Sequence, residues 1–136
     1  MNISEVARLT GLTAKTIRFY EDKGVITPPS RSSNGYRYYS QTNIDELLLI
    51  RRSRLVGFNL DECRELLDFS RDPQRKSADV KAKAEQKLAE IDHKIAELME
   101  MKTTLEALTV QCPGDDSARC PIIEGLCRHA NQGSKE

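Results

Sequence analysis

The first part of the chain carries apolar residues at helical spacing, in short blocks that glycine and proline separate. Residues 3–9 predict one short helix, and residues 10–12 predict a tight break. Thr13 is a good N-cap for a second helix over residues 14–23, which Gly24 stops. Two short helices joined by a turn that contains glycine form a helix-turn-helix. The charged face of the second helix is also what an ordinary solvated helix would show.

A hairpin signal follows the second helix. Two consecutive prolines break any helix, and Asn34-Gly35 then predicts a type I′ turn, which needs positive φ at both central residues. The strand after the turn, residues 36–39, places Tyr36 and Tyr38 on one face and Arg37 and Tyr39 on the other. A hairpin directly after a helix-turn-helix is a wing, and Arg31 and Arg37 can grip phosphates there. An exposed edge hairpin without such a role is the alternative.

Two further helices complete the predicted DNA-binding part. Residues 40–42 cap a third helix that carries three arginines near its C-terminal end. These arginines complement the helix dipole, and Arg54 can also reach a phosphate. Asn59 and Glu62 form a capping box that opens a fourth helix. Cys63 lies on the apolar stripe of that helix and is therefore expected to be a small core residue.

One long helix is predicted next, because residues 74–112 contain neither Gly nor Pro; Ser77 is its natural N-cap. Apolar positions over residues 84–109 step by four and three, which is the spacing of a coiled-coil seam. Polar residues interrupt the seam twice, and Met101 and Leu108 on neighbouring positions take up the apolar contact. A solitary helix would leave this stripe exposed, so a homodimer with paired DNA-binding parts is expected.

Two cysteines bracket a short loop after the long helix. Cys112 and Cys120 each precede a proline, which favours extended or turn geometry at both cysteines. Residues 114–117 are turn formers that can bend the backbone back. The loop can therefore bring two sulfurs together, and soft thiolates favour Cu(I), Zn or Fe–S sites. Oxidation that joins the two thiols would make a redox switch instead, although the spacing is not Cys-x-x-Cys.

Composition narrows the class of protein. With 136 residues, 38% of them hydrophobic and 31% charged, the chain suits one small core-bearing domain joined to a long amphipathic helix. The formal net charge of zero divides into +4 over residues 1–57 and −4 over residues 58–136. A basic N-terminal part suits a polyanion such as DNA.

Several other classes are disfavoured. No apolar run is long enough to span a bilayer and the N-terminus does not resemble a signal peptide, so we expect a cytoplasmic protein without a membrane partner. Four cysteines in such a chain are ligands, redox sites or core residues rather than a disulfide framework. An enzyme is not expected, because nucleophile-elbow, phosphate-loop and zinc-protease motifs are missing. A drug-binding domain is not expected either, because the chain ends soon after the long helix.

Taken together, the motifs resemble the MerR family of transcriptional regulators and, within it, the branch that senses copper. The residues that carry the resemblance are 3–7, 16–21, 34–37, 56–58, 72–75, 77–81 and 112–117. The resemblance implies a mainly α fold. It consists of a winged helix-turn-helix domain (1–70), a linker and dimerisation helix (71–110), a metal-binding loop with a short C-terminal helix (111–128) and a disordered tail (129–136).

The resemblance also implies a mode of action. A homodimer, held by an antiparallel coiled coil, binds promoter DNA whose spacer is too long and distorts it when metal arrives, so that RNA polymerase meets realigned promoter elements. The DNA contacts implied by the family are Lys15, Arg18, Tyr20, Arg31, Tyr36, Arg37 and Arg54. The metal ligands implied are Cys112 and Cys120, and copper-efflux genes are the expected targets.

The identity of the metal rests on charge and ligand number. In the family, position 77 faces the loop of the partner subunit, and sensors of divalent metals carry cysteine there; Ser77 in this chain argues for Cu(I), Ag(I) or Au(I). A +1 ion on two thiolates leaves one negative charge, which the helix start near Ser77 and the Lys81 ammonium would offset.

Two alternatives to a two-sulfur Cu(I) site stay open. Cys127 and His129 follow closely, and with the two loop cysteines they would complete a Zn(II) set. The chain would then be a Zn(II)-responsive regulator of the same family, whereas a thiol redox sensor would need no metal. His129 is otherwise read as a solvated residue, and His93 as an exposed residue of the long helix.

Overall fold

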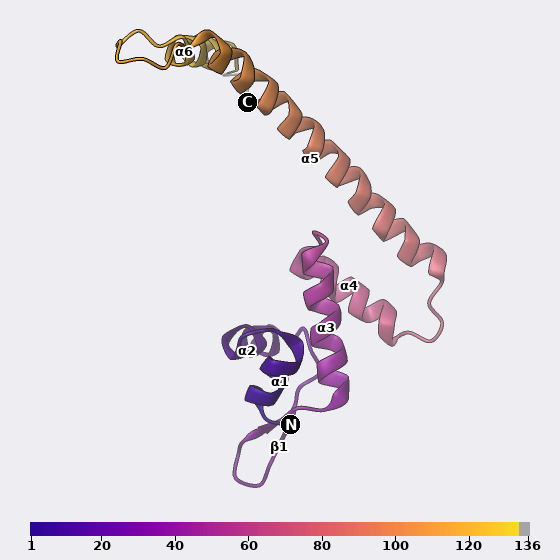
Figure 1. Ribbon diagram of the computed structural model, residues 1–136. Coiled ribbons are helices and arrows are strands. Elements are labelled where there is room, and N and C mark those ends of the chain that lie inside the picture. The colour runs from indigo at the N-terminus through magenta and orange to yellow at the C-terminus, as the bar shows by residue number, and fades with distance from the viewer. Residues whose placement is uncertain (134–136) are drawn as a thin grey trace. The chain divides into compact units, whose positions relative to one another are not determined.

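The computed structural model describes residues 1–133, with side chains as far as residue 128. In chain order the elements are α1 (Ile3–Thr10), α2 (Ala14–Asp22), β1 (Ser30–Arg31), β2 (Arg37–Tyr38), α3 (Gln41–Leu55), α4 (Leu60–Arg71), α5 (Ser77–Gln111) and α6 (Pro121–Gly133) (Figure 1). The predicted mainly helical fold is confirmed. The chain divides into two compact units, residues 1–87 and residues from 88 onward, so α5 belongs partly to each. Of the segment expected to be a tail, 129–133 continue α6 and 134–136 lie outside the described residues.

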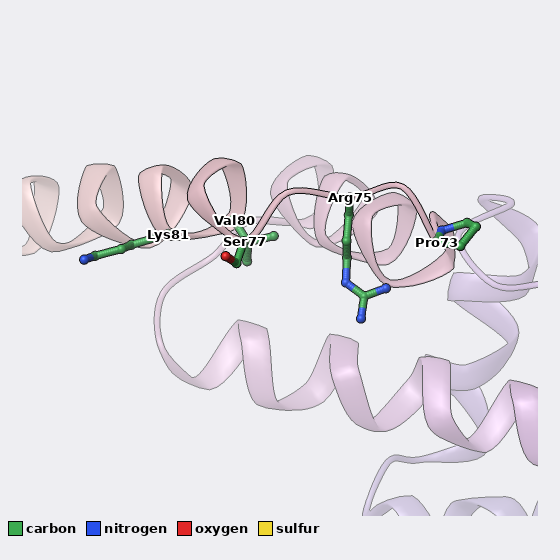
Figure 2. A pocket seen from close by; sticks show the side chains of 5 residues that line it. All are labelled: Pro73, Arg75, Ser77, Val80 and Lys81. Atoms are coloured by element: carbon green, nitrogen blue, oxygen red, sulfur yellow. The ribbon is translucent and has the colours of Figure 1, made fainter.

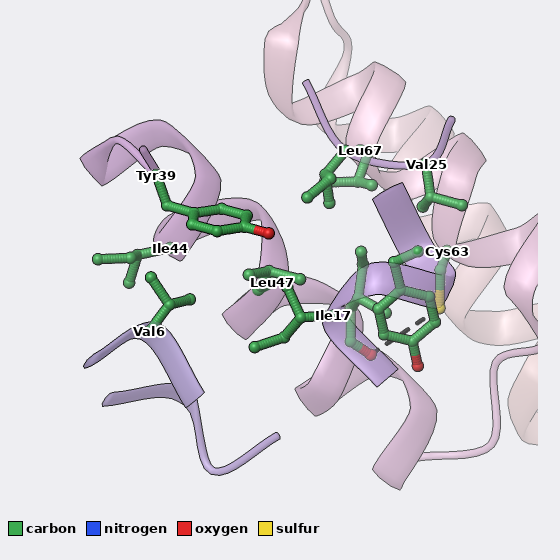
Figure 3. Packing of buried hydrophobic residues seen from close by; sticks show 11 residues of the cluster. Val6, Ile17, Val25, Tyr39, Ile44, Leu47, Cys63 and Leu67 are labelled. Atoms are coloured by element: carbon green, nitrogen blue, oxygen red, sulfur yellow. Dashed lines mark hydrogen bonds between the residues drawn. The ribbon is translucent and has the colours of Figure 1, made fainter. Parts of the chain in front are cut away.

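The first unit is built around one hydrophobic core, to which α1, α2, α3, α4 and the segments between them contribute. Its buried members are Val6, Ile17, Tyr20, Val25, Ile26, Tyr39, Ile44, Leu47, Ile50, Cys63 and Leu67 (Figure 3). Cys63 is 1% exposed, and its burial raises the pKa of its thiol. The thiol therefore stays protonated, and the prediction that Cys63 is a core residue is confirmed.

Side-chain caps start the helices of this unit where the sequence predicts them. The Thr13 hydroxyl accepts from a backbone N–H of the first turn of α2, and Ser40 and Asn59 begin full capping boxes at α3 and α4. At α5 the prediction is off by one residue. Ser77 is the first helical residue, and the Lys76 carbonyl before it accepts the first backbone N–H bonds.

The hairpin between α2 and α3 forms, but with a turn different from the predicted one. Strands β1 and β2 pair antiparallel, with Arg31 opposite Arg37. The Gly35 N–H donates to the Ser32 carbonyl at 2.9 Å, and the Ser32 N–H donates to the Tyr36 carbonyl at 2.8 Å. Among the described residues only glycines have positive φ, here Gly35 at 85°. The predicted type I′ turn is therefore wrong: the hairpin closes through a three-residue loop that ends on a left-handed glycine.

The N-terminus joins this hairpin region. The Met1 ammonium group donates to the Tyr39 carbonyl at 2.9 Å, and the Tyr39 N–H donates back to the Met1 carbonyl at 2.7 Å. The first residue of the chain is thereby bonded to the residue that follows β2.

A buried carboxylate ties together three separate segments of the unit. Glu46 on α3 is 5% exposed and accepts from the Thr27 N–H at 3.0 Å, from the Thr27 hydroxyl at 2.8 Å and from the Arg71 guanidinium at the end of α4. The Asn43 side chain also donates to the Thr27 carbonyl at 2.7 Å. A buried charge is tolerated only when it is paired in this way, so Glu46 holds the α2–β1 connection and α4 against α3.

In the second unit, α6 packs against α5. Leu108 on α5 is 5% exposed, and a Cβ added to Gly125 would lie 2.1 Å from its Cδ2 atom. Leu108 therefore packs against α6 of its own chain, which differs from its predicted contribution to an intermolecular seam. Other seam positions stay exposed, with Leu88 at 59% and Ile95 at 53%. No helix in the described part of the chain is long and apolar enough to cross a membrane.

Candidate functional site

The two loop cysteines lie next to each other in the second unit. Cys112 directly follows α5 and Cys120 directly precedes α6, and both are half-buried. The pKa of the Cys120 thiol lies below its usual value, chiefly because the Ile123 backbone N–H hydrogen-bonds its sulfur. The Ile122 N–H and a hydrogen bond with the Cys112 side chain act in the same direction. The start of α6 thus favours a thiolate at Cys120, in contact with the second sulfur.

The loop between the cysteines is shaped by local hydrogen bonds. Gly114 has a φ of 66°, in the left-handed region. The Ser117 N–H donates to the Asp115 carboxylate at 2.9 Å, and the Arg119 N–H donates to the Ser117 hydroxyl at 3.1 Å. These two side-chain turns bend the backbone as the turn-forming composition predicts, and so bring the two sulfurs together.

Of the other candidate donors, Cys127 is described and does not join this pair. Cys127 is an exposed residue of α6, and the side chain of His129 lies outside the described residues. In the part of the chain whose side chains are described, no three His, Cys, Asp or Glu residues are grouped as a metal site. His93 is exposed and pairs with Glu97 at 2.9 Å. The described sulfur pair can hold a soft ion through two thiolates.

Ser77 and Lys81 lie together at the start of α5. They line one hollow of about 670 Å³ with Pro73, Arg75 and Val80 (Figure 2). The Arg75 guanidinium adds a second cation to this hollow, which sequence reasoning did not predict. The hollow combines a hydroxyl, two cations and the positive end of a long helix, a setting that suits an anionic group.

Three predicted DNA contacts meet in the first unit. Arg18 on α2 and Tyr36 and Arg37 of the hairpin line a hollow of about 380 Å³, together with Asn2, Ile3 and Gly35. Tyr36 is 73% exposed there. Two guanidinium groups and a phenol at one place can bind a backbone phosphate.

The other predicted DNA contacts do not line this hollow. Lys15, Arg31 and Arg54 are exposed, and the Arg31 guanidinium donates to the Gly35 carbonyl at 3.3 Å. Tyr20 is only 8% exposed and packs in the core. Its contact with DNA stays a prediction, while its packing role is plain.

Glu21 joins α2 to the hairpin and was not predicted as a functional residue. Its carboxylate accepts from Arg37 Nε at 2.8 Å and from the Tyr39 hydroxyl at 2.9 Å. The hydrogen bond and the charge of Glu21 raise the pKa of Arg37. Burial, with the Glu21 bond second, raises the pKa of Tyr39 to about 12. No local pattern links residues sixteen positions apart, so the only sequence signal for Glu21 is its place in the 16–21 motif.

Two family models match the chain. The first, described as MerR HTH family regulatory protein, matches residues 1–70, and the second, described as MerR, DNA binding, matches residues 44–108. Together they cover the helix-turn-helix, the hairpin, α3, α4 and most of α5.

Curated proteins and solved structures agree with the family models. The HTH-type transcriptional regulator CueR of Salmonella typhimurium is 57% identical over 135 residues, which cover 97% of this chain and 98% of the relative. The CueR of Escherichia coli O6:H1 is 58% identical over 132 residues, covering 95% and 98%. The crystal structure of the transcription regulator PbrR691 from Ralstonia metallidurans CH34 in complex with lead(II) is similar with a TM-score of 0.82 and 32% identity, covering 93% and 98% of the two chains.

Proposed function

Because the chain belongs to the MerR family of helix-turn-helix regulatory proteins, we propose that it is a transcriptional activator that switches on copper-efflux genes in response to Cu(I). Members of the family are DNA-binding regulators of transcription, so the expectation that the chain is not an enzyme is confirmed. The similarity to CueR over nearly the whole chain supports a metal-responsive regulator and favours copper as the metal.

The contact between the two loop thiols is the main observation that supports Cu(I) as the metal. Cys112 and Cys120 supply two soft sulfurs at one place, and the backbone N–H groups at the start of α6 lower the pKa of Cys120 and so favour its thiolate. Two thiolates suit a soft monovalent ion, whereas zinc in sensing or structural sites takes about four protein ligands. The residues present therefore fit Cu(I), and equally Ag(I) or Au(I).

The charge balance supports the same assignment. Two thiolates around a +1 ion carry one net negative charge, whereas the same pair around a divalent ion is neutral. In an antiparallel dimer, Ser77 and Lys81 of the partner subunit would face that charge, and the hollow they line also holds the Arg75 guanidinium. A cationic helix start would stabilise the negatively charged complex of a monovalent ion. It would interact only weakly with the neutral complex of a divalent ion.

The DNA-facing part of the proposal uses the first unit. A homodimer joined through the exposed α5 seam would bind promoter DNA with Lys15, Arg18, Tyr20, Arg31, Tyr36, Arg37 and Arg54. Metal binding would distort the promoter so that RNA polymerase meets realigned elements. The hollow shared by Arg18, Tyr36 and Arg37 supports this placement of the phosphate contacts.

In vitro transcription from the promoter of the target gene tests the metal assignment. The full-length protein is supplied with chelated Cu(I) or with Zn(II), and transcript is expected with Cu(I) only. Sulfur- and metal-edge absorption spectroscopy on the Cu(I)-loaded protein should give two sulfur neighbours. Activation by Zn(II) alone, or four donors including Cys127 and His129, would replace the proposal by the zinc alternative.

The contact between Cys112 and Cys120 also favours a second candidate, a thiol redox sensor. Hydrogen peroxide would take two electrons and two protons from the two thiols, which form one S–S bond, and would be reduced to two molecules of water. Transcription with hydrogen peroxide under strict metal chelation distinguishes this candidate. The Cu(I) proposal expects no transcript under that condition.

A further inference from the structure

Glu21 places a carboxylate beside the hollow that the proposed function assigns to a DNA phosphate. It lies on the last turn of α2, and its side chain is 12% exposed. An anion at such a place repels a polyanion, so charge alone gives no reason for it. The hydrogen bonds that Glu21 makes do explain its position.

Both oxygens of the Glu21 carboxylate bind side chains from the same short segment after the hairpin loop. Oε2 accepts from Arg37 Nε at 2.8 Å, and Oε1 accepts from the Tyr39 hydroxyl at 2.9 Å. Tyr39 is itself fully buried in the core. The strand that carries Arg37 is thus attached to α2 through one charge-assisted bond and one bond to an immobile core residue.

The bond to Arg37 is made at Nε, at the base of the guanidinium fork. Among the described residues no hydrogen bond engages the two terminal nitrogens, and Arg37 lines the hollow with Arg18 and Tyr36. A planar guanidinium that is held at Nε can turn its terminal N–H groups in only a few directions. Holding Nε therefore aims the terminal nitrogens before any DNA arrives.

We propose that Glu21 is a positioning residue for DNA binding, which holds the Arg37 guanidinium so that it and Arg18 bind one backbone phosphate together. The inference rests on the proposed DNA-binding function and adds a residue that does not itself touch DNA. Arg37 then loses its orientational freedom when the protein folds and not when DNA binds. The entropy cost of binding is therefore smaller, and affinity for DNA is higher.

Positioning and simple charge predict opposite signs when Glu21 is replaced. If the carboxylate only repels DNA, its removal tightens binding and makes binding more salt-dependent. If it positions Arg37, its removal loses a phosphate contact, so binding weakens and the salt slope falls by about one. The sign of the change thus separates the two roles without any knowledge of the operator sequence.

The experiment measures DNA binding by fluorescence anisotropy over a range of salt concentrations, with the full-length protein. The probe is a duplex that the wild-type protein recovers from a random-sequence library. The variants are Glu21→Ala, and Glu21→Gln, which keeps the shape and removes the charge. Asp22→Asn is the matched control, because Asp22 is the neighbouring exposed carboxylate on α2 and has no hydrogen bond to the hairpin in the described part of the chain. Arg37→Ala is measured alone and combined with Glu21→Ala, and Arg18→Ala is measured alone.

Glu21→Ala should weaken binding by about tenfold, with a smaller loss for Glu21→Gln and none for Asp22→Asn. The Glu21→Ala effect should disappear when Arg37 is already alanine, since the two residues act through one contact. Unchanged or tighter binding by both Glu21 variants overturns the proposal, as does a Glu21→Ala effect that persists without Arg37. Failure of Arg37→Ala and Arg18→Ala to weaken binding, or recovery of no duplex by the wild-type protein, overturns the DNA-binding surface itself.

Discussion

Lys87 connects the start of α5 to the DNA-binding core, and its replacement by methionine is a sharp test of that connection. Its ammonium lies 2.9 Å from a carboxylate oxygen of Glu62 on α4 and 5.5 Å from the centre of the Phe58 ring. The two charged side chains are only 12% and 22% exposed. Methionine keeps the apolar stem and removes the charge, so packing changes little.

The expected cost follows from this geometry. At 2.9 Å and an effective dielectric constant of about 20, the Coulomb energy of the pair is about 6 kcal/mol. Desolvation of two largely buried charges offsets most of it, which leaves about 1–2 kcal/mol net. The contact with the Phe58 ring adds about 0.5–1 kcal/mol. Lys87→Met should therefore lower the free energy of unfolding by about 2 kcal/mol.

A double-mutant cycle of Lys87→Met and Glu62→Gln, followed by urea unfolding, measures the coupling of the pair. The chain offers its own control in Lys83 and Glu65, a second ion pair between α5 and α4 whose side chains are 34% and 44% exposed. Exposed pairs couple by less than about 1 kcal/mol. The coupling of Lys87 with Glu62 should be clearly larger than that of the control pair. Equal couplings would refute the view that burial gives this pair its strength.

The contribution of the Lys87–Glu62 pair to the free energy of unfolding depends on pH, and the sign of this dependence follows from the pKa of Glu62. The pKa of Glu62 is lowered, chiefly by the Asn59 backbone N–H and next by the Lys87 side chain. A carboxylate with a lower pKa in the folded state stabilises the protein above its unfolded pKa of about 4.3, and that contribution is lost as the pH falls through the folded pKa. Glu62→Gln should flatten the stability profile in this acidic range and leave its slope near neutral pH unchanged.

Four further substitutions test the sulfur pair, the DNA-binding surface and the packing of α6 on α5. Cys112→Ser or Cys120→Ser should abolish transcription in response to Cu(I) while DNA binding stays near the wild-type level; loss of both together would mean that the loop is structural. Arg18→Ala should weaken DNA binding by about 1–3 kcal/mol, as measured by titration of a labelled duplex, and an unchanged affinity would remove this residue from the interface. Gly125→Ala should lower stability by about 1–3 kcal/mol in thermal unfolding, because its Cβ would lie 2.1 Å from Leu108 Cδ2. The same change in a Leu108→Ala background should be harmless, and a stabilised single variant would contradict the packing.

Local chemistry made much of the fold readable from the sequence. Thr13, Ser40 and Asn59 cap helices at the predicted positions because a cap needs only a side-chain oxygen and the next few backbone N–H groups. The helical spacing of the apolar residues around Cys63 predicts that it lies in the core, and its side chain is buried there. The bend that joins Cys112 to Cys120 likewise depends on turn formers inside the loop.

The features of the fold and the site that the sequence did not predict depend on contacts between residues far apart in the chain. Glu21 contacts Arg37 and Tyr39 only after the hairpin folds back on α2, and no periodic pattern in the sequence predicts these contacts. Leu108 has the spacing of a seam residue, yet α6 covers it because Gly125 lets the two helices approach closely. The Asn-Gly dipeptide predicted a two-residue turn, whereas backbone bonds at Ser32 select a loop one residue longer.

The two bonds between Met1 and Tyr39 bear on how the protein should be produced. Any affinity tag or leader fused ahead of Met1 would emerge beside Asn2 and Ile3, which line the hollow shared by Arg18 and Arg37. A basic or acidic leader would compete for the same surface and distort an affinity measured for a nucleic acid. Recombinant material for such titrations is best made with its first residue free.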